Sequence, residues 1–310
     1  AISITLLGLL KSGDHIVCDW TTYSSTHEML DHRLTDYNIE TTFVDTSNIE
    51  AVRAAIRPNT KIIYFETIAN PSMKVAPVAP LVELAHARDI VVVCDNTFAS
   101  PYVMRPLEWG VDIVVESATK FIGGHSDVIG GSICMKSKLL PSDFLEQIRW
   151  NTMVKLGAPI APFNAWMLIR GIQTLSVRVE RQCQSAAKLA AHFEAHPIIK
   201  QVWYPGLASH PQHEVAKEQM PKFGAMLTFE VEDGDAALKV LDNLELTCFS
   251  ASLGGVRSTT QIPALMAFLD IPESERKDMG IRDGMIRVST GLEDADDLIE
   301  DFDAALSRLS

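Results

Sequence analysis

The chain has 310 residues, of which 47% are hydrophobic and 22% charged, a balance typical of a folded globular protein. Acidic side chains outnumber basic ones by 40 to 27, so the formal charge is −13, which argues against a nucleic-acid surface built on phosphate neutralisation. No apolar run is long enough to cross a bilayer. We therefore expect about two domains and neither nucleic-acid nor membrane partners.

The first half alternates β-branched runs with helical patterns, which is typical of βαβ units and a parallel sheet. Apolar residues at three-and-four spacing predict amphipathic helices over 49–56 and 78–88. The predicted strands cover 16–19, 41–44, 61–66, 90–95 and 112–116.

The pattern changes past residue 150. Helical spacing over 165–195 predicts one extended helix, or two in tandem, bridging two domains. Predicted strands at 225–231 and 285–289 then alternate with predicted helices at 236–244 and 294–309, an α+β arrangement. We place a first domain at 1–168 and a smaller α+β domain at 169–310.

Polar side chains follow the apolar strands of the first half, where open parallel sheets bind their ligands. Asp95 ends one predicted strand, Asn70 and Tyr23 follow two others, and Lys120 comes 25 residues after Asp95 in a hydroxyl-flanked segment. These are the groups that pyridoxal 5'-phosphate (PLP) requires: a lysine amine for a Schiff base, a carboxylate for the pyridine nitrogen, and hydroxyls for the phosphate.

These motifs resemble the cystathionine γ-synthase/γ-lyase family, the Cys/Met metabolism branch of the fold-type-I PLP-dependent enzymes. Within that family the chain is most similar to the methionine γ-lyase group. The resemblance implies a mostly parallel central sheet with helices on both faces and a C-terminal α+β domain. It is carried by Val93–Pro101, Ser117–Asp127, Glu66-Thr67, Asn70-Pro71, Arg170-Gly171, Tyr204–Leu207, Ser252–Gly255 and Arg287–Ser289.

The resemblance implies a role for each matching residue. Lys120 forms the Schiff base and shuttles protons, and Asp95 pairs with the pyridine nitrogen. Tyr23 stacks on the ring and takes part in proton transfer. Asn70 bonds the cofactor's phenolic oxygen, Ser117 and Thr119 contact the phosphate, and Arg287, with Ser252 beside it, binds the substrate carboxylate.

The reaction type is less constrained, because γ-elimination, β-elimination and γ-replacement share their early steps. Cystathionine-handling members commonly carry glutamate where this chain has Ala251, and alanine cannot pair with a distal ammonium. We expect γ-elimination on a short sulfur amino acid such as methionine, giving 2-oxobutyrate, ammonia and a thiol. The alternatives are a cystathionine γ-lyase, or γ-replacement of the cystathionine γ-synthase or O-acylhomoserine sulfhydrylase type.

Other features indicate structural roles. His27 and His32 are five residues apart, not the four that place zinc ligands on one helical face, so no metal site is expected. The five cysteines form no C-x-x-C pair, which favours reduced thiols and a cytoplasmic protein. A non-catalytic descendant of the family is disfavoured because Asp95 and Lys120 are both present.

The first residues of the chain also resemble the family, and the resemblance bears on the upstream sequence and on the quaternary structure. The run beginning at Ala1 looks like the continuation of the family's phosphate-binding Ser-Gly-Met-Ala segment. We therefore expect that segment, the start of the first domain and the family's N-terminal arm to lie upstream of residue 1. Family active sites borrow groups from a neighbouring subunit, so we expect a homotetramer built as a dimer of dimers.

Overall fold

The computed structural model describes residues 1–269 and 273–309, and the chain divides into two compact units. Two short segments, Asn70–Lys74 and Thr119–Val128, belong to the second unit although the chain around them belongs to the first. Unit 1 contains Ala1–Ala69, Val75–Ala118 and Ile129–Leu168, and unit 2 contains the two short segments with Ile169–Ser310.

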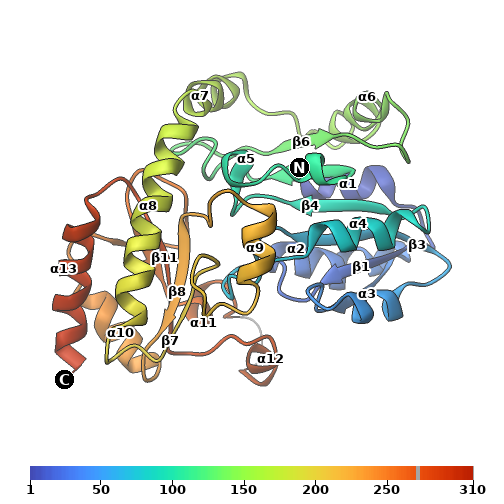
Figure 1. Cartoon of the computed structure of the whole chain (residues 1–310). Helices are drawn as coiled ribbons and strands as arrows, with labels where there is room; N and C mark the ends of the chain where they lie inside the picture. Colours follow the sequence, from blue (N-terminus) through green and yellow to red (C-terminus); the bar gives the residue numbers. More distant parts are fainter. Residues whose placement is uncertain (270–272, 310) are drawn as a thin grey trace. The chain divides into compact units, whose positions relative to one another are not determined.

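Unit 1 is built on a six-stranded sheet with the order β2-β1-β3-β4-β5-β6 (Figure 1). The first five strands are parallel, and β6 joins the edge antiparallel to β5. The predicted mostly parallel sheet is confirmed. The strands are β1 (His15–Asp19), β2 (Glu40–Val44), β3 (Thr60–Glu66), β4 (Val91–Asp95), β5 (Ile113–Glu116) and β6 (Ser132–Met135).

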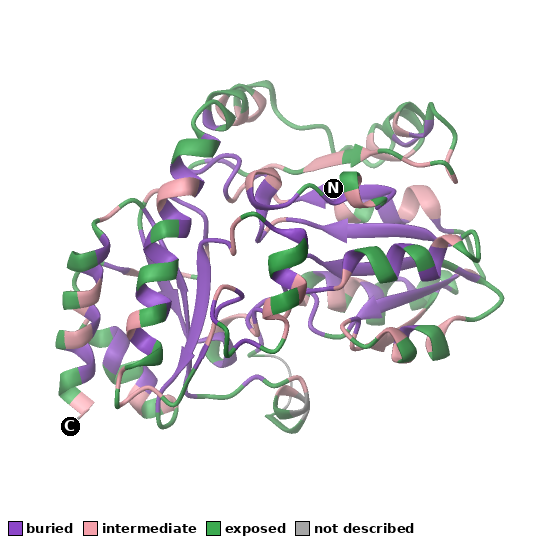
Figure 2. Ribbon diagram, viewed as in Figure 1, coloured by how far each residue is buried: buried purple, intermediate pink, exposed green. Residues whose placement is uncertain are grey.

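Central strands β3 and β4 are buried along nearly their whole length because apolar side chains on both faces pack against other elements (Figure 2). Tyr64 and Val93 pack in a cluster with Leu6 and Phe144, which come from helices. The α-helices of unit 1 are α1 (Ile2–Leu9), α2 (Ser24–Glu28), α3 (Ile49–Ala55), α4 (Val78–His86), α5 (Ser100–Val103) and α6 (Phe144–Ile148). Unit 1 also contains the π-helical segments η1 (Met29–Arg33) and η4 (Arg149–Met153) and the 3-10 segments η2 (Thr35–Tyr37) and η3 (Pro106–Trp109).

The tandem-helix alternative is the one that the structure adopts. The chain forms α7 (Pro162–Ile172) and α8 (Leu175–Glu194) rather than one continuous helix. At the break, the Gly171 carbonyl accepts from the Thr174 hydroxyl at 3.2 Å and from Arg178 Nη2 at 2.9 Å. Side chains therefore satisfy a backbone acceptor at the end of α7.

Unit 2 holds a five-stranded sheet with the order β7-β8-β11-β10-β9. The two predicted strands appear as β8 (Met226–Glu230) and β11 (Met285–Ser289). Three short strands join them that the sequence pattern did not indicate: β7 (Gln201–Trp203), β9 (Cys248–Phe249) and β10 (Thr259–Gln261).

Helices α8, α10 (Gly234–Asp242) and α13 (Ala295–Leu306) pack with this sheet. The core contains Phe193, Phe229 and Phe302, whose ring centroids lie 4.8–5.9 Å apart. The remaining elements are α9 (His213–Gln219), α11 (Pro263–Met266), α12 (Glu273–Asp278) and η5 (Ser307–Leu309).

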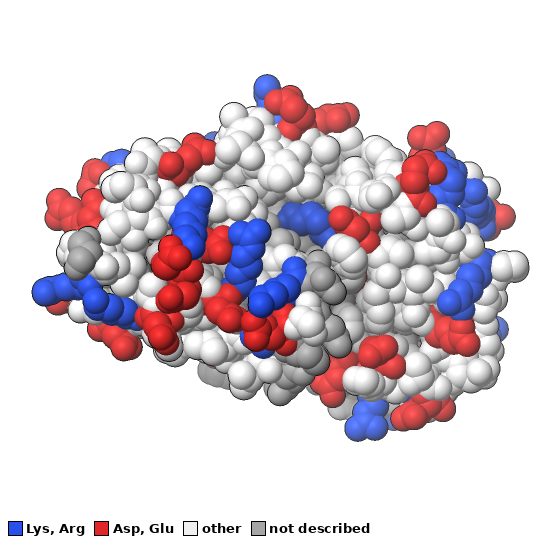
Figure 3. Space-filling view, turned by 90° about the horizontal axis from the view of Figure 1, so that it is seen from below, with Lys and Arg blue, Asp and Glu red and all other residues white. Residues whose placement is uncertain are grey.

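The face drawn in Figure 3 mixes acidic and basic side chains. Pairs such as Lys200–Glu232, at 2.8 Å, place opposite charges next to each other on the surface. Throughout the part of the chain that the structure covers, no helix is both long and apolar enough to cross a membrane.

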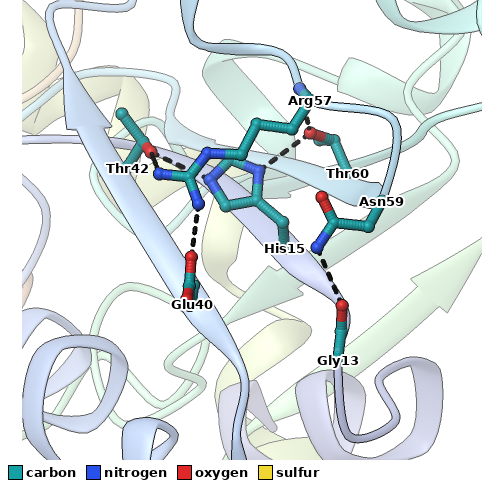
Figure 4. Close-up of polar contacts among 7 residues, drawn as sticks. All are labelled: Gly13, His15, Glu40, Thr42, Arg57, Asn59 and Thr60. Atoms are coloured by element: carbon teal, nitrogen blue, oxygen red, sulfur yellow. Dashed lines mark hydrogen bonds and ion pairs between the residues drawn. The ribbon is translucent and has the colours of Figure 1, made fainter.

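A buried histidine at the start of β1 contacts threonines on the neighbouring parallel strands β2 and β3 (Figure 4). His15 Nδ1 lies 2.8 Å from Thr60 Oγ1, and Nε2 lies 2.8 Å from Thr42 Oγ1. Arg57 pairs with Glu40 and donates to the same Thr42 hydroxyl. Burial, and secondarily the Arg57 charge, lowers the pKa of His15 from 6.5 to about 4.

The lowered pKa of His15 predicts how the stability of the protein changes with pH. Since the unfolded chain takes up the His15 proton first, the stability linked to the neutral ring is complete above pH 6.5 and is lost as the pH falls towards 4. Between pH 7 and 5, the native free energy of unfolding should fall by roughly 2 kcal/mol more than that of His15→Gln. Urea unfolding at both pH values measures the difference.

The matched control is His32→Gln, because the His32 side chain is 72% exposed. That variant should follow the native pH dependence. Parallel pH curves for His15→Gln and the native protein would contradict the assignment.

Candidate active site

Three buried carboxylates stand at the carboxyl ends of neighbouring strands in unit 1. Glu66 ends β3, Asp95 ends β4 and Glu116 ends β5, and each is at most 8% exposed. Parallel pairing places Glu66 opposite Asp95 in register. The topology therefore gathers acidic groups where a parallel sheet binds its ligands.

Asp95 is held by the residue two positions along the chain. Its Oδ1 accepts from the Thr97 hydroxyl at 2.5 Å and from the Thr97 N–H at 2.9 Å. The same hydroxyl accepts from the Ser117 N–H at 2.8 Å. Burial raises the pKa of Asp95, and the Thr97 bonds oppose that rise. Thr97 thus connects two predicted cofactor-binding residues.

The third buried carboxyl group, that of Glu116, differs from Asp95 in its hydrogen-bond partner. Its Oε1 accepts from Asn96 Nδ2 at 2.9 Å, and burial raises the pKa of Glu116 to about 8. At neutral pH the side chain is therefore mostly protonated, which limits the negative charge beside Asp95. From the sequence, neither Thr97 nor Glu116 was assigned a role.

Tyr23 lies in the segment that follows β1 and precedes α2, and it is 50% exposed. Its backbone N–H donates to Glu66 Oε1 at 2.6 Å, and the Thr22 hydroxyl donates to the same oxygen at 3.2 Å. Glu66 therefore fixes the backbone of Tyr23 and leaves its ring accessible.

The predicted lysine belongs to unit 2, together with five other predicted site residues. Lys120 Nζ donates to Ser252 Oγ at 3.3 Å. Burial, and secondarily the charge of Arg287, lowers the pKa of the Lys120 ammonium. A lowered pKa increases the neutral fraction of the amine, which is the form that reacts with a carbonyl.

Arg287 lies on β11 and is only 3% exposed. Its Nη1 donates to Asn70 Oδ1 at 3.0 Å, and its Nη2 donates to the carbonyls of Ala251, at 3.3 Å, and Ser252, at 3.2 Å. Burial lowers the pKa of Arg287 to about 9. A desolvated guanidinium of this kind is suited to bind a carboxylate.

The structure thus assembles the predicted residues within two groups, one in each unit. Unit 1 holds Asp95, Ser117 and Tyr23 at the strand ends, whereas Asn70, Lys120, Ala251, Ser252 and Arg287 belong to unit 2. Thr119 is the first residue of the unit 2 segment that carries Lys120, and it is partly buried.

These residues fit PLP by their chemistry. Asp95 is a buried carboxylate whose charged form burial disfavours, so a protonated pyridine nitrogen would compensate it. Lys120 is a partly desolvated amine, and Ser117 and Thr119 supply hydroxyls. Among the side chains that the structure describes, no group of three or more from His, Cys, Asp or Glu is arranged to hold a metal ion.

The α/β sheet, the buried aspartate at a strand end and the desolvated lysine define a PLP-dependent enzyme. The comparison with known families specifies the branch. The chain belongs to the Cys/Met metabolism PLP-dependent enzymes, whose family pattern it matches over residues 1–307.

Several characterised relatives are similar along nearly the whole chain. The L-methionine gamma-lyase of Fusobacterium nucleatum subsp. polymorphum is 43% identical over 312 residues, covering 100% of this chain and 78% of that protein. The cystathionine gamma-lyase of Bacillus subtilis is 42% identical, covering 97% of this chain and 78% of the relative. The cystathionine beta-lyase of Lactococcus lactis subsp. cremoris is 41% identical, covering 98% and 78%.

Solved structures show the same fold. The cystathionine gamma-lyase from Lactobacillus plantarum, complexed with L-serine, superposes with a TM-score of 0.93 at 38% identity. The match covers 99% of this chain and 79% of that one. The family and the fold-type-I architecture expected from the sequence are confirmed.

Thr97 provides a direct test of the Asp95 environment. Thr97→Val removes the hydroxyl that donates to the Asp95 carboxylate and accepts from Ser117. Loss of a hydrogen bond to a charged group should weaken PLP binding by about 10-fold or more. Titration of the cofactor-free protein with PLP measures this change.

Thr97→Ser is the matched control because it keeps the hydroxyl, and its PLP affinity should stay within about 3-fold of native. Equal affinities for the valine and serine variants would show that the hydroxyl does not support the cofactor site.

Proposed function

We propose that the protein is a γ-elimination lyase that converts methionine, or a similar sulfur amino acid, to 2-oxobutyrate, ammonia and a thiol. The observation that carries this proposal is the group in unit 2, where Lys120 contacts Ser252 and the buried Arg287 donates to the carbonyls of Ala251 and Ser252. The similarity to methionine γ-lyases at 42–43% identity supports it.

Arg287 binds the substrate carboxylate in this proposal. A guanidinium presents two parallel N–H donors to a carboxylate, and burial strengthens that attraction. The Asn70 amide oxygen and two backbone carbonyls accept from Arg287 and orient the guanidinium. Ser252, which reaches Lys120, keeps the amine close to the bound amino acid.

PLP, when bound, delocalises the electron pair left on the substrate carbon after proton removal. Lys120 Nζ takes the proton from Cα, and a second proton leaves Cβ. The Cγ–S bond then breaks with its electron pair on sulfur. Of the two protons removed from carbon, one returns to Cγ by way of Lys120 Nζ, and the other reaches the leaving thiolate by way of the Tyr23 hydroxyl. Water hydrolyses the unsaturated product to 2-oxobutyrate and ammonia.

Ala251 supports a substrate with an apolar end. Its methyl group is exposed and offers no charge to a distal ammonium, and the residue is adjacent to Ser252. An apolar pocket discriminates only modestly among short sulfur amino acids, so cystathionine γ-lyase activity and γ-replacement are the competing reactions.

We propose in addition that the chain assembles as a homotetramer, a dimer of dimers. Large apolar side chains are exposed on one stretch of unit 1, namely Trp150 (56%), Leu156 (57%), Phe163 (66%) and Trp166 (55%). Large apolar side chains left exposed in this way are typical of a surface that another chain covers. Sedimentation velocity tests this assembly, and a monomer at micromolar concentration would contradict it.

The five cysteines are free, and three of them are buried. Free thiols are typical of a reducing compartment, so we propose that the enzyme works in the cytoplasm.

A substrate panel tests the reaction. Incubation with methionine, homocysteine, cystathionine and cysteine should release 2-oxobutyrate, fastest from methionine. Ala251→Glu should shift the preference between methionine and cystathionine by about 10-fold or more towards cystathionine, because it adds a partner for the distal ammonium.

The absence of 2-oxobutyrate from every γ-substituted substrate would contradict the lyase assignment. Release of an acyl group from an acylated homoserine that depends on added thiol would instead identify a γ-replacement enzyme.

A further inference from the structure

Helix α8 carries a buried arginine that bonds to the segment after Lys120. Arg178 is 4% exposed, and its Nη1 donates to the Phe121 carbonyl at 2.9 Å. Its Nη2 donates to the Gly171 carbonyl at 2.9 Å, and its Nε donates to Thr174 Oγ1 at 3.0 Å. These partners are neutral oxygens, so the guanidinium acts as a rigid multiple donor rather than as half of an ion pair.

The backbone around this guanidinium is shaped to admit it. Gly124 has a φ of +74°, and a Cβ added there would lie 2.0 Å from Arg178 Nη1. A Cβ on Gly171 would lie 2.4 Å from the Gly123 carbonyl oxygen. Only glycine at both positions lets the segment after Lys120 pack against the end of α7 and the arginine.

One turn further along the same helix, a second side chain holds the loop of Ser252. Gln182 is fully buried, and its Nε2 donates to the Gly255 carbonyl at 2.7 Å. Gly254, with a φ of +74°, approaches the lysine segment so closely that an added Cβ would lie 2.8 Å from the Phe121 nitrogen. The two loops are therefore in backbone contact, and each is bonded to α8.

We propose that Arg178 and Gln182 are positioning residues that use one face of α8 to hold Lys120 Nζ within reach of Ser252 Oγ. Residues four apart on a helix lie on the same face, so the spacing of the two side chains sets the spacing of the two loops. This assignment rests on the proposed role of Lys120. It adds a distinct function for α8, which no motif in the sequence indicated.

Lysine cannot replace Arg178 in this role. An ammonium has no planar fork, so it cannot donate to the Phe121 and Gly171 carbonyls and to the Thr174 hydroxyl with the geometry seen here. A displaced Phe121 carbonyl moves the adjacent Lys120. We therefore expect the loss to appear in the reactivity of the lysine and not only in stability.

The experiment compares Arg178→Lys with Arg181→Gln in the PLP-loaded enzyme. Arg181 lies on the same helix, is 43% exposed and pairs with Asp294. Two quantities are measured: the PLP dissociation constant and the pH midpoint of the visible absorbance of the bound cofactor. Arg178→Lys should weaken PLP binding by about 10-fold or more and shift the midpoint by about half a pH unit or more. Arg181→Gln should leave both values unchanged.

A second pair of variants, at Thr174, tests the proposal if Arg178→Lys does not fold. Thr174→Val removes the hydroxyl that orients Arg178 Nε, whereas Thr174→Ser retains it. The valine variant should shift the absorbance midpoint and the serine variant should restore it. If Arg178→Lys folds and keeps the native PLP affinity and absorbance midpoint, the positioning role is wrong. If Arg178→Lys does not fold, a folded Thr174→Val with the native absorbance midpoint would overturn it.

A failure of the positioning role can be distinguished from a failure of the proposed function. If the visible band survives in Lys120→Ala, the assigned lysine is wrong. If that band is lost but the Arg178 and Thr174 variants behave like native enzyme, only the positioning role fails. Neither readout depends on which sulfur amino acid the enzyme consumes.

Discussion

Desolvation of charged side chains is the constraint on which the site depends. Burial penalises the charged forms of Asp95 in unit 1 and of Lys120 and Arg287 in unit 2. Polar groups contact each of these side chains: Thr97 donates to Asp95, Ser252 accepts from Lys120, and carbonyls accept from Arg287. Such groups are prepared for partners of opposite charge, which a cofactor and an amino acid supply.

Close backbone packing also shapes the surroundings of Lys120. The lysine segment and the Ser252 loop approach each other at Gly254, and the lysine segment makes room for Arg178 at Gly124. A larger residue at Gly254 would force the loops apart, and one at Gly124 would collide with the Arg178 guanidinium. The geometry of Lys120 is therefore set by close backbone contact and by donors from α8, with little freedom to relax.

Much of unit 1 could be predicted because its strands are continuous β-branched runs and the residues that we propose to bind the cofactor, such as Asp95, stand at their ends. Strands β7, β9 and β10 could not be predicted, because segments of two or three residues are too short to show an alternation of apolar and polar side chains. The roles of Arg178 and Gln182 were also missed, because their partners lie 57 and 73 positions away and are backbone carbonyls without a sequence signature. The break between α7 and α8 could be predicted only as one of two alternatives, because its cause is the set of side-chain bonds to Gly171.

The central claim is that Lys120 is the residue that bonds to the cofactor. Borohydride reduction of the PLP-loaded enzyme, followed by proteolysis and mass spectrometry, tests it most directly, because reduction makes the link between lysine and cofactor permanent. We expect the pyridoxyl label on the peptide that contains Lys120. A label on any other lysine, with Lys120 unmodified, would contradict it.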